Sequence, residues 1–134
     1  MKNDTNRDKP LSDAELTQQQ DLARANALQE KDKPLVTNIY TADPSAHVFE
    51  GKIYIYPSHD IESEASTNDD GDQFAMRDYH VLSVNSDTGE AIDHGVALSV
   101  DDIPWAEKQL WAPDAAHKNG QYYFYFPARD YEGI

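Results

Sequence analysis

Two stretches of the chain match one another at an offset of 70 residues, and this repeat limits the possible folds more than any other feature. Residues 42–60 (ADPSAHVFEGKIYIYPSHD) align without a gap with residues 112–130 (APDAAHKNGQYYFYFPARD). The identical positions are Ala42, Ala46, His47, Pro57 and Asp60 in the first copy, and Ala112, Ala116, His117, Pro127 and Asp130 in the second. A fixed period with strand signals inside it indicates a repeated β-propeller blade. A chance match between two hairpins is the weaker explanation.

Short segments rich in β-branched and aromatic residues follow one another after Pro34 and predict strands. They span residues 35–36, 48–49, 53–56, 79–84, 95–100 and 122–126. Turn signals separate them at hairpin spacing, at residues 50–51, 85–89 and 119–120. The pattern predicts an all-β, antiparallel fold. Because a propeller closes with at least four blades, a chain with about one and a half repeats is expected to be incomplete.

The first 33 residues have a different composition. They contain no aromatic residue, since the first one is Tyr40, and their charges nearly balance. Ser12 and Glu15 have the spacing of a capping box, and good helix formers continue until Pro34. We therefore expect one α-helix at about residues 13–31 within an N-terminal appendage, residues 1–33, and a separate propeller portion at residues 34–134.

The net charge argues against two classes of partner. The 134 residues contain 11 Lys and Arg against 25 Asp and Glu, a formal charge of −14, with no basic cluster. Phosphate backbones and anionic lipid surfaces both require basic patches, so neither nucleic acid nor membrane is an expected partner. Residues 1–10 lack the apolar core of a signal peptide, so we expect a cytoplasmic chain. Without cysteine, disulfides and thiolate metal sites are excluded.

The segment 60–72 carries six acidic residues and no basic one, and is expected to form a solvated loop. Its Asp-Asp-Gly-Asp stretch is similar to a calcium loop, but an EF-hand would need carboxylates where Ser66 and Arg77 stand. His59, His80 and His94 show no metal-ligand spacing along the chain. The sequence therefore predicts no metal site and no cofactor.

Two motifs resemble glycoside hydrolase family 43. The first is Thr-Ala-Asp-Pro-Ser at residues 41–45, which leads through Gly51 and Lys52 into the strand at 53–56. The second is Leu-Trp-Ala-Pro-Asp at residues 110–114, followed by Gly-Gln-Tyr-Tyr-Phe-Tyr at 120–125. The resemblance covers residues 34–134.

This resemblance implies the first one to two blades of a five-bladed β-propeller, and inverting hydrolysis of plant-type glycans that contain arabinose or xylose. The family includes α-L-arabinofuranosidases, β-xylosidases and arabinanases. A carbohydrate-binding propeller without turnover is the alternative. The resemblance implies neither an oligomeric state nor a preference between the two sugars.

The resemblance also implies roles for three residues. Asp43 matches the general base that activates water, although an Asp-Pro dipeptide is equally typical of a turn. Its neighbour Pro44 is expected to hold Asp43 in an extended conformation. Trp111 matches a wall of the sugar pocket, with plain blade packing as an equal alternative. Asp114 lies where relatives tolerate other residues, so it is expected to line the substrate site or end a strand.

Other parts of the family's machinery are expected beyond Ile134. The general acid, a Glu, and the Asp that tunes its pKa come from later blades, and so does the His of the axial cation or water site, where that site exists. A structural calcium is therefore unsupported by these residues, and this chain alone is expected to be inactive. His47 and His117, which align in the repeat, are expected to form equivalent hydrogen bonds at strand ends within each blade.

Overall fold

A computed structural model describes residues 12–31 and 33–133, with the backbone alone for residues 24–31. The chain divides into two compact units, Met1–Pro34 and Leu35–Ile134, and each is described by itself. Among the described residues, no helix combines the length and apolar character needed to cross a membrane.

The first unit contains the expected helix, α1 (Asp13–Lys31). Its start is a capping box: the Ser12 N–H and hydroxyl both donate to Glu15 Oε2, at 2.8 and 2.7 Å. These hydrogen bonds to the carboxylate lower the pKa of Glu15. Leu16 and Leu22 are both exposed, which agrees with the thin apolar stripe of the sequence.

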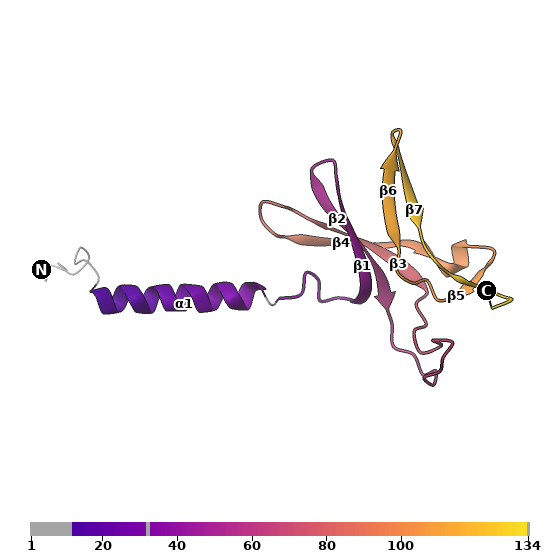
Figure 1. Ribbon diagram of the computed structural model, residues 1–134, viewed down its shortest axis with the longest axis horizontal. Helices are drawn as coiled ribbons and strands as arrows, with labels where there is room; N and C mark the ends of the chain where they lie inside the picture. Colours follow the sequence, from indigo (N-terminus) through magenta and orange to yellow (C-terminus); the bar gives the residue numbers. More distant parts are fainter. Residues whose placement is uncertain (1–11, 32, 134) are drawn as a thin grey trace, which may run out of the picture. The chain divides into compact units, whose positions relative to one another are not determined.

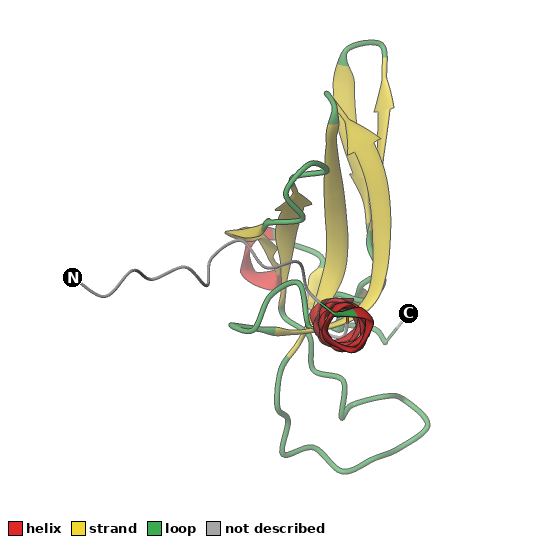
Figure 2. Cartoon of the chain, turned by 90° about the vertical axis from the view of Figure 1, so that its left-hand side faces the viewer, coloured by secondary structure: helices red, strands yellow, loops and turns green. Residues whose placement is uncertain are grey.

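The second unit begins with a four-stranded antiparallel sheet in the order β1-β2-β3-β4 (Figure 1). Its strands are β1 (Tyr40–Phe49), β2 (Lys52–Asp60), β3 (Asp78–Val84) and β4 (Ala91–Ser99). Glu50 and Gly51 form the tight β1–β2 turn with φ of 50° and 77°, the left-handed pair that matches strand twist. A long loop joins β2 to β3 and extends beyond the end of the sheet in both ribbon views (Figure 2).

Shorter elements follow the sheet. They are the 3₁₀ helix η1 (Val100–Asp102), β5 (Ala106–Lys108), β6 (Asp114–Lys118), β7 (Gln121–Tyr125) and β8 (Arg129–Asp130). β6 pairs with β7 as a hairpin, and β5 pairs with β8, so the second group of strands forms two small sheets. One complete four-stranded sheet and part of another match the predicted one to two propeller blades.

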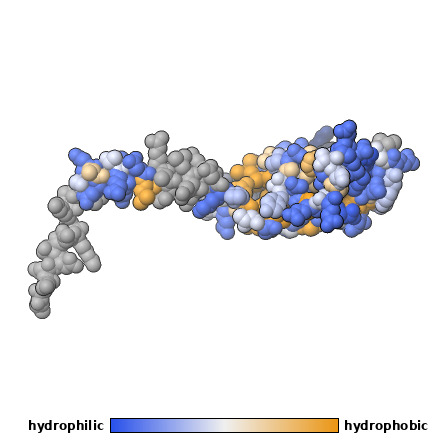
Figure 3. Space-filling model, turned by 90° about the horizontal axis from the view of Figure 1, so that it is seen from below, coloured by the Kyte–Doolittle hydropathy of each residue, from blue (hydrophilic) through white to orange (hydrophobic). Residues whose placement is uncertain are grey.

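The core lies between the two groups of strands. Tyr79 of β3 is fully buried among Val100, Ile103, Ala106 and Leu110. Other aromatic side chains remain at the surface: Trp105 is 51% exposed and Tyr125 59%. Apolar residues are visible on the surface of this unit in Figure 3.

Two strand predictions are wrong in detail. Residues 35–36 form no strand, because β1 begins at Tyr40 opposite Asp60, the last residue of β2, and earlier residues have no strand to pair with. Val100 belongs to η1 and not to β4, because Ser99 caps η1. The Ser99 hydroxyl accepts from Asp101 N, and the Ser99 N–H donates to the Asp102 carboxylate.

The two histidines of the repeat are not in equivalent positions. The second hairpin turns at Asn119 and Gly120, one residue earlier than the offset of 70 predicts from Glu50 and Gly51. A shift of one residue places a side chain on the other face of a strand. The His117 ring therefore lies against Tyr122 of its own hairpin, with ring centroids 4.5 Å apart and the ring planes tilted by 32°. His47 instead bonds to a residue of another sheet, as described below.

Candidate active site

A wide depression of about 1010 Å³ lies where the first sheet, the β2–β3 loop and the second group of strands meet. Its lining includes Asp43 of β1, Asp60 at the end of β2, and Trp111 before β6. Phe74 of the loop and Arg129 of β8 also line it. The two motifs of the repeat therefore contribute to one concave surface.

A bulge in β1 sets the position of Asp43. Ala42 pairs with Ser58 and Ser45 pairs with Tyr56, so Asp43 and Pro44 together face the single residue Pro57. Bulges of this kind redirect a side chain, and they occur often beside active sites. Asp43 is exposed and has a left-handed φ of 46°. The extended conformation expected from Pro44 is therefore wrong, because the bulge overrides the local preference.

The second motif repeats this backbone feature with a different residue. Ala112 has φ of 32° and precedes Pro113, as Asp43 precedes Pro44. Asp114 is the first residue of β6 and pairs with Tyr125, as Ser45 pairs with Tyr56 after the bulge of β1. The structural counterpart of Asp43 in the second copy is thus an alanine.

Trp111 is held firmly at the depression. Its Nε1–H donates to the carbonyl of Phe74 at 2.9 Å, and the two rings meet edge to face at 6.4 Å. Gly71 has φ of 72°, and a Cβ there would lie 2.8 Å from Cη2 of Trp111. The glycine thus lets the loop approach the indole closely. Trp111 both lines the depression and packs against the loop.

Tyr79 fixes the backbone beside Trp111. Its hydroxyl donates to the carbonyl of Trp111 at 2.9 Å, and it also lies 3.3 Å from that of Pro127. Burial raises the pKa of Tyr79, which keeps the phenol protonated as a donor. The core of the protein thereby positions the wall of the depression.

The second half of the acidic loop is attached to the second group of strands, so the expectation that the whole loop is solvated is wrong for this half. Lys108 Nζ lies 2.6 Å from Asp72, and Arg129 lies 3.6 Å from Asp70. Lys108 and Arg129 are paired neighbours on β5 and β8. They come from positions far along the chain, so the composition of the loop could not indicate them.

The Asp72–Lys108 ion pair predicts a pH-dependent stability. The hydrogen bond from Lys108 lowers the pKa of Asp72 below its usual 3.8, so the carboxylate stabilises the fold above that value. The contribution is lost as pH falls through the lowered pKa. In a complete propeller with these residues, Asp72→Asn is expected to lower the urea midpoint at pH 6 to 7, and the difference from the native protein is expected to disappear once the pH falls below the lowered pKa of Asp72.

Asp69→Asn is the matched control. Asp69 forms no ion pair among the described residues, and its replacement removes one negative charge, as Asp72→Asn does. A deficit for Asp72→Asn that persists unchanged at low pH would contradict the ion-pair explanation.

No protein-family model matches the chain, but individual proteins and structures do. Xylosidase/arabinosidase 43A of Humicola insolens is 68% identical over 103 residues, and a xylosidase/arabinosidase of Bacteroides ovatus is 56% identical over 101 residues. Each match covers 75% of this chain, and 32% and 31% of the respective relatives, so the chain spans about a third of their length.

Solved structures agree with these relatives. A GH43 β-xylosidase/α-arabinofuranosidase from a compost metagenome, in complex with xylotriose, has a TM-score of 0.73 at 70% identity, over 76% of this chain and 31% of the other. A GH43_1 enzyme of Xanthomonas citri in complex with xylose has a TM-score of 0.66 at 50% identity, over 83% of this chain and 32% of the other. The chain belongs to glycoside hydrolase family 43. The predicted partial propeller with an N-terminal helix is confirmed.

Asp114 of this family 43 chain is not among the described residues that line the depression. Its Oδ1 lies 2.6 Å from His47 Nε2 and accepts from Ala115 N at 2.8 Å. The bond to His47 lowers the pKa of Asp114. His47 therefore joins β1 to β6, and the expected bond within its own blade is wrong. A substrate-lining role for Asp114 stays a prediction that this geometry does not favour.

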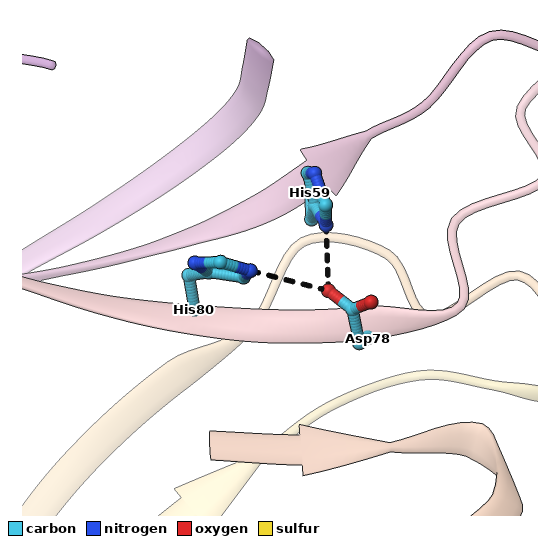
Figure 4. A group of neighbouring side chains, drawn as sticks. All are labelled: His59, Asp78 and His80. Carbon is cyan, nitrogen blue, oxygen red and sulfur yellow. Dashed lines mark hydrogen bonds and ion pairs between the residues drawn. The ribbon is translucent and has the colours of Figure 1, made fainter. Parts of the chain in front are cut away.

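The family 43 fold also brings together three residues that the sequence did not connect. His59 of β2 lies beside Asp78 and His80 of β3, and potential ligand atoms of all three lie within 4.8 Å of one another (Figure 4). His59 and Asp78 are far apart along the chain and meet only because Ser58 pairs with Tyr79. The absence of metal-ligand spacing along the chain therefore could not exclude this group.

Proposed function

We propose that the complete protein is an inverting glycosidase that acts on glycans containing xylose or arabinose, and that this chain supplies its general base, Asp43. The position of Asp43 carries the proposal: a strand bulge directs an exposed carboxylate into a concave surface. The relatives named xylosidase/arabinosidase and the structure with bound xylotriose support this substrate class.

Inverting hydrolysis uses two carboxyl groups on opposite faces of the sugar, about 6.5–9.5 Å apart, with water between the base and the anomeric carbon. Asp43 is suited to the base because it is exposed and lines the depression. The acid would come from a later blade. The Trp111 ring, fixed by the Phe74 carbonyl, offers an apolar plane for the C–H face of the sugar.

The stereochemistry of the product tests this mechanism. We expect proton NMR of early reaction mixtures with the complete enzyme to show the sugar product with inverted anomeric configuration. Retention of configuration would require a nucleophile close to the acid and would exclude Asp43 as a water-activating base.

A carbohydrate-binding propeller without turnover is the alternative, because an acid and an aromatic ring in a depression also suit binding. Xylo-oligosaccharide binding without any hydrolysis, in a complete protein that lacks the later Glu acid, would favour this alternative.

Trp111 gives a second test of the sugar site. In the complete enzyme, Trp111→Ala is expected to raise KM roughly tenfold, about 1.4 kcal/mol of lost binding, because the stacking surface is removed. Trp105→Ala is the matched control, since this tryptophan is more exposed than Trp111 and stacks on Phe126, outside the described lining of the depression. A lowered melting temperature with unchanged KM for Trp111→Ala would assign Trp111 to packing alone.

A further inference from the structure

The group of His59, Asp78 and His80 lies apart from the proposed sugar site. Asp60 lines the depression, and successive side chains of a strand point to opposite faces of the sheet. His59 and the other two members are not among the described residues that line the depression. The side chains of His59 and His80 are 18% and 11% exposed, so water reaches the group only partly.

Asp93 determines which nitrogen of His80 faces this group. The Nδ1 atom of His80 lies 2.8 and 3.0 Å from the two carboxylate oxygens of Asp93. An ionised carboxylate only accepts hydrogen bonds, so Nδ1 carries the proton in the neutral ring. Asn38 Nδ2 donates to Asp93 at 2.6 Å and fixes the carboxylate in turn. His80 Nε2 therefore directs its lone pair towards Asp78 Oδ1, 3.7 Å away.

This orientation is typical of metal-binding histidines. A histidine ligand usually donates its other N–H to a carboxylate, which fixes the tautomer and ring direction. The lone pair of His80 Nε2 and the Asp78 oxygen face each other without a proton between them in that tautomer. His59 Nδ1 donates to the same Asp78 oxygen at 2.6 Å and completes a three-sided arrangement; it would give up this proton when a metal ion binds (Figure 4).

The local charge also favours a cation. Asp78 and Asp93 are only 24% and 11% exposed, and within the described part of the chain neither forms an ion pair with Lys or Arg. Two partly buried carboxylates whose close neighbours are neutral imidazoles would gain from a divalent ion.

We propose that His59, Asp78 and His80 bind a divalent transition-metal ion of the zinc class, with Asp93 orienting His80. Two imidazoles and one carboxylate are a known zinc donor set, with water as the fourth ligand. Calcium and magnesium prefer oxygen donors only, and two of these three donors are nitrogens. Zinc bonds of about 2.0–2.1 Å place tetrahedral ligand atoms about 3.3 Å apart. Asp78 must therefore move away from His59 by less than about 1 Å, and the two imidazole nitrogens, which lie within 4.8 Å of one another, must take up the same spacing.

The ion would join the end of β2 to the start of β3. These are the two ends of the long loop, and residues of this loop line the depression. This site extends beyond the proposed glycosidase function and does not depend on it.

Direct binding measurements test the site. A complete propeller with these residues, treated with chelator and dialysed, would be titrated with Zn²⁺ by calorimetry and with Co²⁺ by visible absorption. We expect stoichiometric binding and intense Co²⁺ bands typical of a tetrahedral site. His80→Gln and His59→Gln are each expected to weaken zinc binding more than about 100-fold, and Asp93→Asn about 10–100-fold.

His94→Gln is the matched control, because His94 lies in the same sheet but bonds to Ser83. It is expected to leave zinc affinity unchanged. Far-UV circular dichroism without metal checks that each variant folds, and if His80→Gln does not fold, the more exposed His59→Gln decides. Absence of stoichiometric binding by the native protein, or equal binding by His59→Gln and His94→Gln, would overturn the proposal.

Discussion

Replacing Asp43 by Asn in the complete enzyme is expected to lower turnover by about 10²–10⁴-fold, the usual contribution of a general base. The amide is nearly isosteric with the carboxylate, so the bulge and the depression are preserved, but it cannot accept a proton from water. Sugar binding should remain close to native, because the base acts on water in the transition state. The measurements are steady-state kinetics on aryl xylosides and arabinofuranosides, and calorimetry with xylo-oligosaccharides.

Asp114→Asn is the comparison variant, because it removes the same charge from the equivalent motif. We expect a much milder loss of turnover, since Asp114 bonds to His47 and lies outside the described lining of the depression. Near-normal turnover in Asp43→Asn would remove Asp43 from the catalytic role. An equal collapse in both variants would give Asp114 a part in the chemistry.

The 134 residues expressed alone are expected to show no hydrolysis above buffer and to unfold with low cooperativity. Inversion needs an acid opposite the base, and the family's acid is expected from a later blade. Tyr122, Tyr123 and Tyr125 of the second hairpin are between 41% and 59% exposed, which leaves an aromatic surface open to self-association.

Size-exclusion chromatography, thermal melts and assays on aryl xylosides measure these properties. The complete enzyme in the same buffer is the positive control. A monomeric preparation of the chain with a sharp transition and measurable hydrolysis would contradict the expected position of the acid and the dependence on further blades.

Strands with strong local signals could be predicted from the sequence. β2, β3 and β7 are rich in aromatic and β-branched residues, and Gly-containing turns precede β2 and β7. The sequence does not predict β6, because Asp-Ala-Ala-His-Lys has no β-forming character and becomes a strand only by pairing with β7. The sequence does not predict the full extent of β1 for a similar reason, since Asp43 and Pro44 interrupt its pattern at the bulge.

The sequence predicts only those residues of the candidate site that belong to one of the two motifs. Asp43 and Trp111 lie at one depression, as the two motifs indicated. The ion pairs of Lys108 and Arg129 with the acidic loop depend on the pairing of β5 with β8, which no local pattern in these short strands indicates. The same holds for His59 and His80, which meet across a strand pair.

Because of the bulge at Asp43 and Pro44, the position of the Asp43 carboxylate depends on the number of residues between Ala42 and Ser45. Side-chain contacts can be replaced one at a time during evolution, but loss of a single residue between Ala42 and Ser45 would restore a regular ladder with β2. Asp43 would then lose the left-handed turn that exposes it. This segment should therefore accept many substitutions around Asp43 but no insertion or deletion, which distinguishes it from ordinary surface loops in comparisons among homologues.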